Sequence, residues 1–229
     1  MHKIRLFHKL KICILFVLAA LFVLSDGAYA KTSEWARFGY IAHGCGAIDG
    51  CAYTNSLDAL DASIKSGVKV VEMDFRITDD QCLVCSHDPV KGLTKDEFLS
   101  QKIEGKYTPM TAETALRHLM EAGDVYLVVD AKKANIAKIY KEIDRLCVEC
   151  GGSDYRKMII PQFYQESDLD KLKKIYNYSD YIFTTYKLPE MSVEEYEVIA
   201  MFCKKNNVGT ITIPKRRVSK ELIDMLKSY

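Results

Sequence analysis

Short runs of β-branched and aromatic residues alternate with amphipathic helical patterns along most of the chain. The runs predict six principal strands, over residues 38–43, 68–77, 125–130, 158–163, 181–186 and 208–213, and a short extra strand over 82–86. Helical spacing follows each principal strand, over residues 54–67, 112–122, 135–150, 167–176, 192–205 and 219–227. This alternation predicts parallel strands joined by crossover helices.

The number of units bears on the fold class. A TIM barrel has eight βα units and typically about 250 residues, whereas this chain shows six units in the 199 residues over 31–229. We therefore predict an α/β fold with a TIM-barrel-like βα repeat. Either the barrel is incomplete at its C-terminal end or two strands escape the pattern, and an open parallel sheet is the alternative. Residues 88–110 show only a weak helical segment near 96–101, which predicts an active-site loop.

The first 30 residues follow a different pattern. A basic start precedes an uninterrupted apolar run over residues 12–24, and Ala28-Tyr29-Ala30 places small residues at the −3 and −1 positions of a cleavage site. This layout is typical of a secretory signal peptide, and the run is shorter than the roughly 20 residues that span a bilayer. We predict cleavage after Ala30, export to the cell envelope or medium with no stable membrane anchor, and one domain over residues 31–229.

Composition narrows the range of partners. The chain is 48% hydrophobic and 28% charged, as expected of a globular protein. Without the leader, which contains four basic residues and one acidic residue, the net charge falls from +1 to −2. This balance argues against a nucleic-acid partner and against a polybasic membrane-binding surface. Seven cysteines follow the leader, so at least one thiol is unpaired within the chain, and Cys45 and Cys51 are either bridged or free. The oligomeric state stays open.

Two acidic residues interrupt the apolar strand over residues 68–77. Glu72 and Asp74 are two positions apart, so both carboxylates face the same side of the strand. A carboxylate is costly to bury without a partner, and a divalent cation with oxygen ligands is a natural one. The alternative is a structural ion pair with Lys69 or Arg76, although direct pairing along one strand is awkward.

Other polar residues stand at the ends of neighbouring strands. Asp130 ends the next parallel strand, and Lys132 lies two residues beyond it. The carboxyl ends of parallel strands converge on the ligand site in βα folds. We therefore expect one pocket to be shared by His43, Glu72, Asp74, Asp130 and Lys132. Asp130 can instead cap a loop, and Lys132 can be solvated. Gln162 and Tyr186 at later strand ends can contact substrate, although a place at the edge of the core is favoured.

These residues belong to a longer ordered series. It comprises Ile41-Ala42-His43-Gly44, Thr54-Asn55-Ser56-Leu57, Glu72-Met73-Asp74, Thr78-Asp79 and Val84-Cys85-Ser86-His87-Asp88. The series resembles the glycerophosphodiester phosphodiesterase family, within the phosphatidylinositol-phospholipase-C-like phosphodiesterases. That family has His-Arg-Gly, Glu-Asn-Thr, Glu-x-Asp, Thr-x-Asp and His-Asp motifs on a TIM barrel. The dense match covers residues 41–88, with weaker βα correspondence to about residue 213. Gly44 replaces the arginine, Thr54 replaces the glutamate, and the chain stops where the family continues with two βα units.

The resemblance implies a role for each motif residue. His43 and His87 would form an acid/base pair, and Glu72, Asp74 and Asp130 would hold Ca²⁺ or Mg²⁺. Asp130-Ala131-Lys132 stands where the family has Glu-x-Lys, so Lys132 would contact phosphate. Asn55 either helps bind phosphate or only begins the helix beside Thr54. The implied substrates are glycerophosphodiesters or related lipid-derived head groups.

The chemistry of phosphodiester cleavage agrees with this assignment. Histidine has the side-chain pKa nearest neutrality and can accept or donate the proton, while a metal ion and a lysine stabilise charge on the phosphoryl oxygens. The resulting hypothesis is an exported, metal-dependent phosphoric diester hydrolase. Alternatives are a phospholipase-type enzyme that forms a cyclic phosphate, a catalytically inactive phosphodiester- or glycan-binding domain, and a truncated chain that folds poorly.

Overall fold

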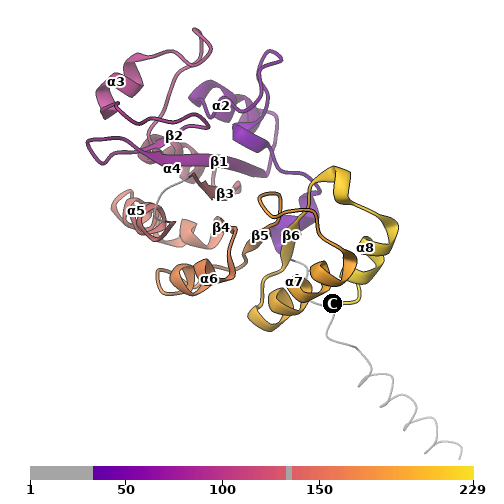
Figure 1. Cartoon of the computed structure of the whole chain (residues 1–229). Coiled ribbons are helices and arrows are strands. Elements are labelled where there is room, and N and C mark those ends of the chain that lie inside the picture. Colours follow the sequence, from indigo (N-terminus) through magenta and orange to yellow (C-terminus); the bar gives the residue numbers. More distant parts are fainter. Residues whose placement is uncertain (1–32, 133–135) are drawn as a thin grey trace, which may run out of the picture. The chain divides into compact units, whose positions relative to one another are not determined.

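The computed structural model describes residues 33–132 and 136–229 (Figure 1). The predicted leader over residues 1–30 lies outside the described residues. Within the described part of the chain, no helix has the length and apolar character needed to cross a membrane.

One sheet contains all the named strands. They are β1 (Val70–Ile77), β2 (Leu83–Cys85), β3 (Tyr126–Ala131), β4 (Ile159–Phe163), β5 (Ile182–Thr184) and β6 (Thr210–Thr212). The order across the sheet is β2-β1-β3-β4-β5-β6, and every pair is parallel except the antiparallel β1–β2. Because β2 and β6 form its two edges, the sheet is open, as expected for an incomplete barrel. The predicted α/β, TIM-barrel-like fold class is confirmed.

Helices connect the parallel strands at nearly the predicted positions (Figure 1). They are α2 (Leu57–Lys65), α3 (Lys95–Ser100), α4 (Ala112–Ala122), α5 (Ile136–Glu149), α6 (Glu166–Lys173), α7 (Val193–Asn206) and α8 (Lys220–Leu226). Short 3₁₀ segments are η1 (Glu34–Phe38), η2 (His43–Cys45), η3 (Ser153–Met158) and η4 (Lys215–Arg217). Local chemistry sets the boundaries: Ser192 and Glu195 form a capping box at α7, and Gly123 ends α4 with a φ of +80°.

The two faces of the sheet differ because side chains alternate along each strand. Met73 and Phe75 point to the outer face, which α2 and α4–α8 cover to form the main core. The inner face begins with a smaller apolar cluster that includes Val70, Val128 and Trp35. Toward the carboxyl ends of the strands its buried residues become polar: Glu72, Asp74, Asp130, Gln162 and Thr184. The inner face is therefore apolar near the amino ends of the strands and carries buried polar and acidic side chains near their carboxyl ends.

Two predicted local features are wrong. Residues 38–43 do not form a strand, because η1 ends at Phe38 and Gly39 turns the chain with a φ of +76°. Only Ala42 pairs with β1, accepting a 2.9 Å hydrogen bond from the Glu72 N–H. The helix predicted over residues 54–67 begins later than expected: Asn55 has a φ of +49°, and Ser56 caps α2.

Candidate active site

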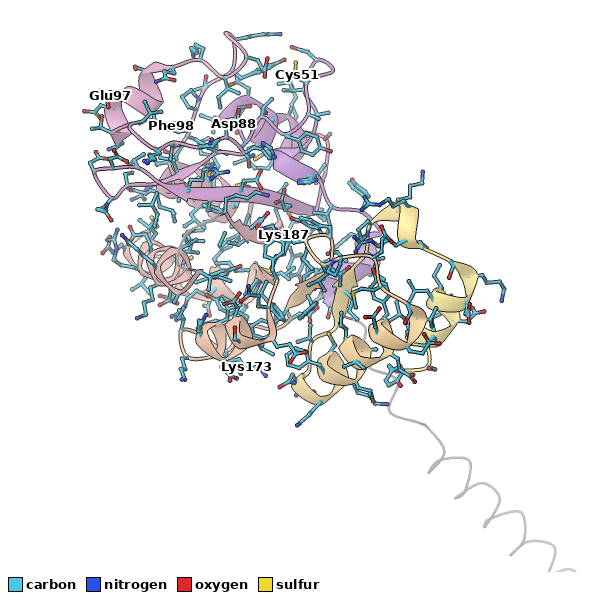
Figure 2. The ribbon with its side chains drawn as sticks, viewed as in Figure 1. Cys51, Asp88, Glu97, Phe98, Lys173 and Lys187 are labelled. Atoms are coloured by element: carbon cyan, nitrogen blue, oxygen red, sulfur yellow. The ribbon has the colours of Figure 1, made fainter. Side chains whose placement is uncertain are left out.

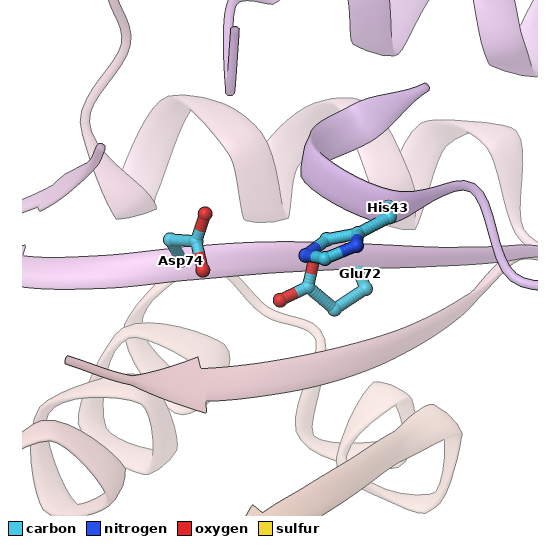
Figure 3. Close-up of side chains that lie close together, drawn as sticks. All are labelled: His43, Glu72 and Asp74. Carbon is cyan, nitrogen blue, oxygen red and sulfur yellow. The ribbon is translucent and has the colours of Figure 1, made fainter. Parts of the chain in front are cut away.

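One histidine and two carboxylates meet on the polar part of the inner face. His43, presented by η2, lies over Glu72, and Asp74 lies further along β1 (Figure 3). The His43 Nε2 is 3.4 Å from Glu72 Oε2, and one ligand atom from each of the three residues lies within 4.8 Å of the others. The expected placement of Glu72 and Asp74 on one face is thus observed, and His43 reaches the same point.

The electrostatics of this cluster follow from burial. The pKa of Glu72 is raised well above its usual value, first because burial disfavours the carboxylate and then because Asp74 is a nearby like charge. The Gly44 N–H opposes this by donating to Glu72 Oε2 at 2.8 Å. Burial also lowers the pKa of the half-exposed His43 more than the Asp74 charge raises it. His43 is therefore a neutral base near neutral pH.

Lys132 joins the acidic residues of two strands. Asp74 and Asp130 are opposite each other in the β1–β3 register, as the sequence predicted. The Lys132 ammonium lies 2.9 Å from Asp74 Oδ1 and also contacts Asp130 Oδ2. These contacts raise its pKa even though burial opposes the charge. The structure thus brings Lys132 into the predicted pocket as the counter-ion of two acids.

Asn55 fixes the position of Asp74. Its Nδ2 donates to Asp74 Oδ2 at 2.8 Å, and its Oδ1 accepts from the Asp74 N–H at 2.9 Å. Both amide atoms therefore bind one residue, and the left-handed backbone at Asn55 makes this possible. In this structure Asn55 orients a carboxylate, and the substrate contact implied by the resemblance remains a prediction.

His87 and His43 flank one aromatic ring. Tyr53 packs edge-on against His43 with ring centroids 4.6 Å apart, and its centroid is 6.0 Å from that of His87. His87 Nδ1 lies 3.2 Å from Asp88 Oδ1, and Arg76 donates to the His87 carbonyl at 2.6 Å. Both predicted acid/base residues therefore lie close to the same tyrosine ring, and sequence reasoning missed this tyrosine.

Gly44 is required by this arrangement. Its φ is +57°, and a Cβ built there would lie 2.5 Å from the Tyr53 Cα. No larger residue fits without moving the backbone that presents Tyr53. An arginine at position 44, as in the family pattern, would therefore require the backbone at Tyr53 to move.

Two tyrosines that sequence reasoning did not assign to the site hold Asp130. Tyr164 donates to the carboxylate, 2.8 Å from both oxygens, and Tyr186 lies 3.4 Å from Oδ2. Gln162 in turn donates to the Tyr164 hydroxyl at 3.1 Å. Gln162 and Tyr186 therefore belong to the hydrogen-bond network around Asp130, not only to the edge of the core. Continuing the alternation of β4 from Gln162 to Tyr164 is the sequence signal for the latter.

The donor set fits a hard divalent cation. Glu72, Asp74 and Asp130 are three buried carboxylates, and Lys132 is the cation in contact with two of them. Ionisation of all three acids would leave two negative charges for a cation to balance. In addition, Asp74 Oδ1 is buried without a hydrogen bond of good geometry, despite its ion pair with Lys132. Oxygen donors with excess negative charge suit Ca²⁺ or Mg²⁺.

Comparisons with known proteins agree with the fold. A structure from Galdieria sulphuraria has a TM-score of 0.69 at 12% identity, covering 82% of this chain and 79% of that one. An Oleispira antarctica phosphodiesterase solved with its product sn-glycerol-3-phosphate has a TM-score of 0.64 at 15% identity, with 82% and 79% coverage. A glycerophosphodiester phosphodiesterase from Parabacteroides distasonis has a TM-score of 0.56 at 21% identity, covering 81% and 88%. No curated protein sequence matches the chain significantly.

The fold and site define a βα-barrel-like protein with an acidic centre at the strand carboxyl ends. Residues 48–146 match the model of the glycerophosphoryl diester phosphodiesterase family. The match covers less than half of the chain, and it supports the resemblance to this family that the ordered motifs of the sequence predicted.

Proposed function

We propose that the chain is a metal-dependent glycerophosphodiester phosphodiesterase, a phosphoric diester hydrolase that uses His43 and His87 for proton transfer. The observation that carries the proposal is the convergence of His43, Glu72 and Asp74 within 4.8 Å, beside the Asp130–Lys132 pair. The family-model match over residues 48–146 and the structural neighbours support the same reaction class.

The two histidines divide the proton transfers. Nε2 of His43, in a ring kept neutral by partial burial, accepts the proton of the attacking water or substrate hydroxyl. His87, on the other side of Tyr53, donates a proton to the departing alkoxide. Asp88, 3.2 Å from His87 Nδ1, orients that imidazole. The side chains of His43 and His87 are both about half exposed, so a substrate can reach either imidazole.

The remaining polar residues organise charge. Glu72, Asp74 and Asp130 would hold Ca²⁺ or Mg²⁺, which when bound would stabilise negative charge on the phosphoryl oxygens. Asn55 keeps Asp74 aimed at the site, and Tyr164 keeps Asp130 aimed at it. Lys132 balances part of the negative charge of Asp74 and Asp130, with which it forms ion pairs.

The test is phosphorus NMR of glycerophosphocholine incubated with the chain and Ca²⁺ or Mg²⁺. Wild type should convert the diester to glycerol phosphate, whereas His43→Ala and His87→Ala should each lower the rate by about 10²-fold or more. His118→Ala is the matched control, because His118 pairs with Asp61 between α2 and α4 and should leave the rate unchanged.

The product distinguishes the alternatives. A cyclic phosphate that persists would indicate a phospholipase-type reaction in which a substrate hydroxyl attacks. Ligand binding without turnover, unaffected by His87→Ala, would contradict the proposal and favour a binding domain. From the leader pattern we further propose export, and detection of a mature chain beginning at Lys31 in the envelope or medium would support it.

A further inference from the structure

The ring of Tyr53 packs against both histidines assigned to proton transfer. Its centroid lies 4.6 Å from that of His43, with the ring planes at 83°, and 6.0 Å from that of His87, with the planes at 37°. Packed aromatic pairs have centroids about 4.5–7 Å apart. Burial in the core does not explain this residue, because Tyr53 is 51% exposed. Its contacts with the two imidazoles therefore point to a role in the site.

Each imidazole contacts a carboxylate at one nitrogen and is about half exposed. His43 Nε2 lies 3.4 Å from Glu72 Oε2, and His87 Nδ1 lies 3.2 Å from Asp88 Oδ1. The side chain of Asp88 is itself 90% exposed. Exposed side chains change rotamer on the picosecond to nanosecond timescale, and a contact at one nitrogen does not fix the plane of a ring. The Tyr53 ring supplies a further contact to both imidazoles.

The backbone at Tyr53 takes a conformation that a bulky residue rarely adopts. Its φ is +60°, in the left-handed region. Close contacts hold it there: a Cβ at Gly44 would lie 2.5 Å from the Tyr53 Cα, and the Asn55 N–H donates to the Gly44 carbonyl at 3.1 Å. Left-handed non-glycine residues persist where their surroundings over-determine them, and they cluster at functional sites. The segment that carries Tyr53 is therefore fixed to the segment that carries His43.

We propose that Tyr53 is a positioning residue that fixes the orientation of the His43 and His87 imidazoles relative to each other. The two rings come from separate segments, η2 and the chain after β2. Cys51 and Asp88, which are close in sequence to Tyr53 and His87, both lie above β1 in Figure 2. The inference rests on the proposed function, because a proton acceptor and a proton donor must reach the same phosphodiester. A misplacement of about 1 Å can lower a rate about 10²-fold.

The test compares Tyr53→Ala and Tyr53→Phe with wild type and with the control Tyr40→Ala. Tyr40 is a tyrosine of similar exposure, at 59%, on the segment that precedes η2. kcat and KM are measured with glycerophosphocholine and Ca²⁺ or Mg²⁺, and the order parameters of the imidazole Cδ2–H bonds are measured by carbon-13 relaxation. Tyr53→Ala should lower kcat about 10- to 100-fold, change KM less than about twofold, and lower the order parameters of both imidazoles. Tyr53→Phe keeps the ring and should preserve all three quantities, as should the control.

A third variant, Tyr53→Gly, separates the ring from the backbone. Glycine adopts a φ of +60° readily, so this variant loses the ring contacts and also eases the left-handed backbone. We expect the same loss of kcat as in Tyr53→Ala, with a melting temperature close to that of wild type. This result would assign the loss to the missing ring rather than to partial unfolding.

The outcomes separate this inference from the proposed function. Imidazole order parameters that Tyr53→Ala leaves unchanged would overturn the role of Tyr53 whether or not the chain hydrolyses a diester. In an active chain, an unchanged kcat, or a kcat that falls only together with the melting temperature and that phenylalanine does not rescue, would also overturn it. A wild type that hydrolyses no diester, but whose imidazole order depends on the Tyr53 ring, would contradict only the proposed function.

Discussion

Replacing Glu72 by glutamine tests how the acidic centre is balanced without a metal. Glu72 is buried, its pKa is raised by burial and by the Asp74 charge, and Lys132 contacts other carboxylates. Glutamine has nearly the same shape, and its carbonyl can still accept the 2.8 Å hydrogen bond from Gly44 N–H. The substitution therefore removes a charge and leaves the packing intact.

The sign of the pH dependence follows from the raised pKa. The folded chain binds the Glu72 proton more tightly than the unfolded chain, whose pKa is near 4.5. The stability contributed by Glu72 is complete below that pH and is lost as the pH rises through the folded-state pKa. At pH 8 without metal, Glu72 of the wild type is therefore either ionised, which leaves a buried charge without a counter-ion, or protonated, which costs free energy because the solution favours proton release.

The expected magnitude is about 1–3 kcal/mol, the range for a buried polar group without an adequate partner. With EDTA at pH 8, Glu72→Gln should be more stable than wild type by this amount, or about 2–10 °C in Tm for a chain of this size. At pH 4.5 the two should agree within about 0.5 kcal/mol. Saturating Ca²⁺ should then stabilise wild type more than the variant.

Thermal and urea unfolding at both pH values provide the measurement. Glu113→Gln is the matched control, because Glu113 is half-exposed on α4 and pairs with Arg117 in an i,i+4 contact. Its effect should be below about 0.5 kcal/mol at pH 8. A Glu72→Gln variant that is less stable than wild type at pH 8 without metal would refute the charge balance described above.

Three further predictions follow from the same structure. Gly44→Ala should cost about 2 kcal/mol or more because a Cβ would clash there, whereas Gly50→Ala, also at positive φ but with open space around it, should cost about 1 kcal/mol in urea unfolding. Asp180→Ala should cost about 3 kcal/mol, because the buried carboxylate accepts hydrogen bonds from Trp35 Nε1 and backbone N–H groups; Trp35, the single tryptophan, should report this by a red-shifted emission. With metal present, kcat/KM should fall as the pH drops through a His43 pKa below 6.5, since protonation removes the base; an acid limb above pH 7 would contradict this assignment.

Alternation along the strands made much of this site predictable. Glu72 and Asp74 are two apart on β1, and Asp130 falls opposite Asp74 because parallel neighbours keep their register. The helix boundaries were also predictable where side-chain caps and glycines set them, as at Gly123. These features depend on residues that are close in sequence or on the fixed geometry of a parallel sheet.

The parts that could not be predicted depend on tertiary contacts of loops. Nothing in the local pattern shows that Asn55 takes a left-handed backbone conformation and binds Asp74 through both amide atoms. The position of Tyr53 between two histidines depends on its close approach to Gly44, which is visible only in three dimensions. The predicted first strand failed for a related reason, because the chain turns at Gly39 before it can pair along β1.

The most direct test of the account is the initial rate of glycerophosphocholine hydrolysis by wild type before EDTA, after EDTA, and after Ca²⁺ or Mg²⁺ is restored. Because Glu72, Asp74 and Asp130 leave more negative charge than Lys132 balances, the account predicts turnover that EDTA abolishes and one of the two cations recovers. An unchanged rate in EDTA, or no turnover by a cooperatively folded chain with either cation, would contradict the account.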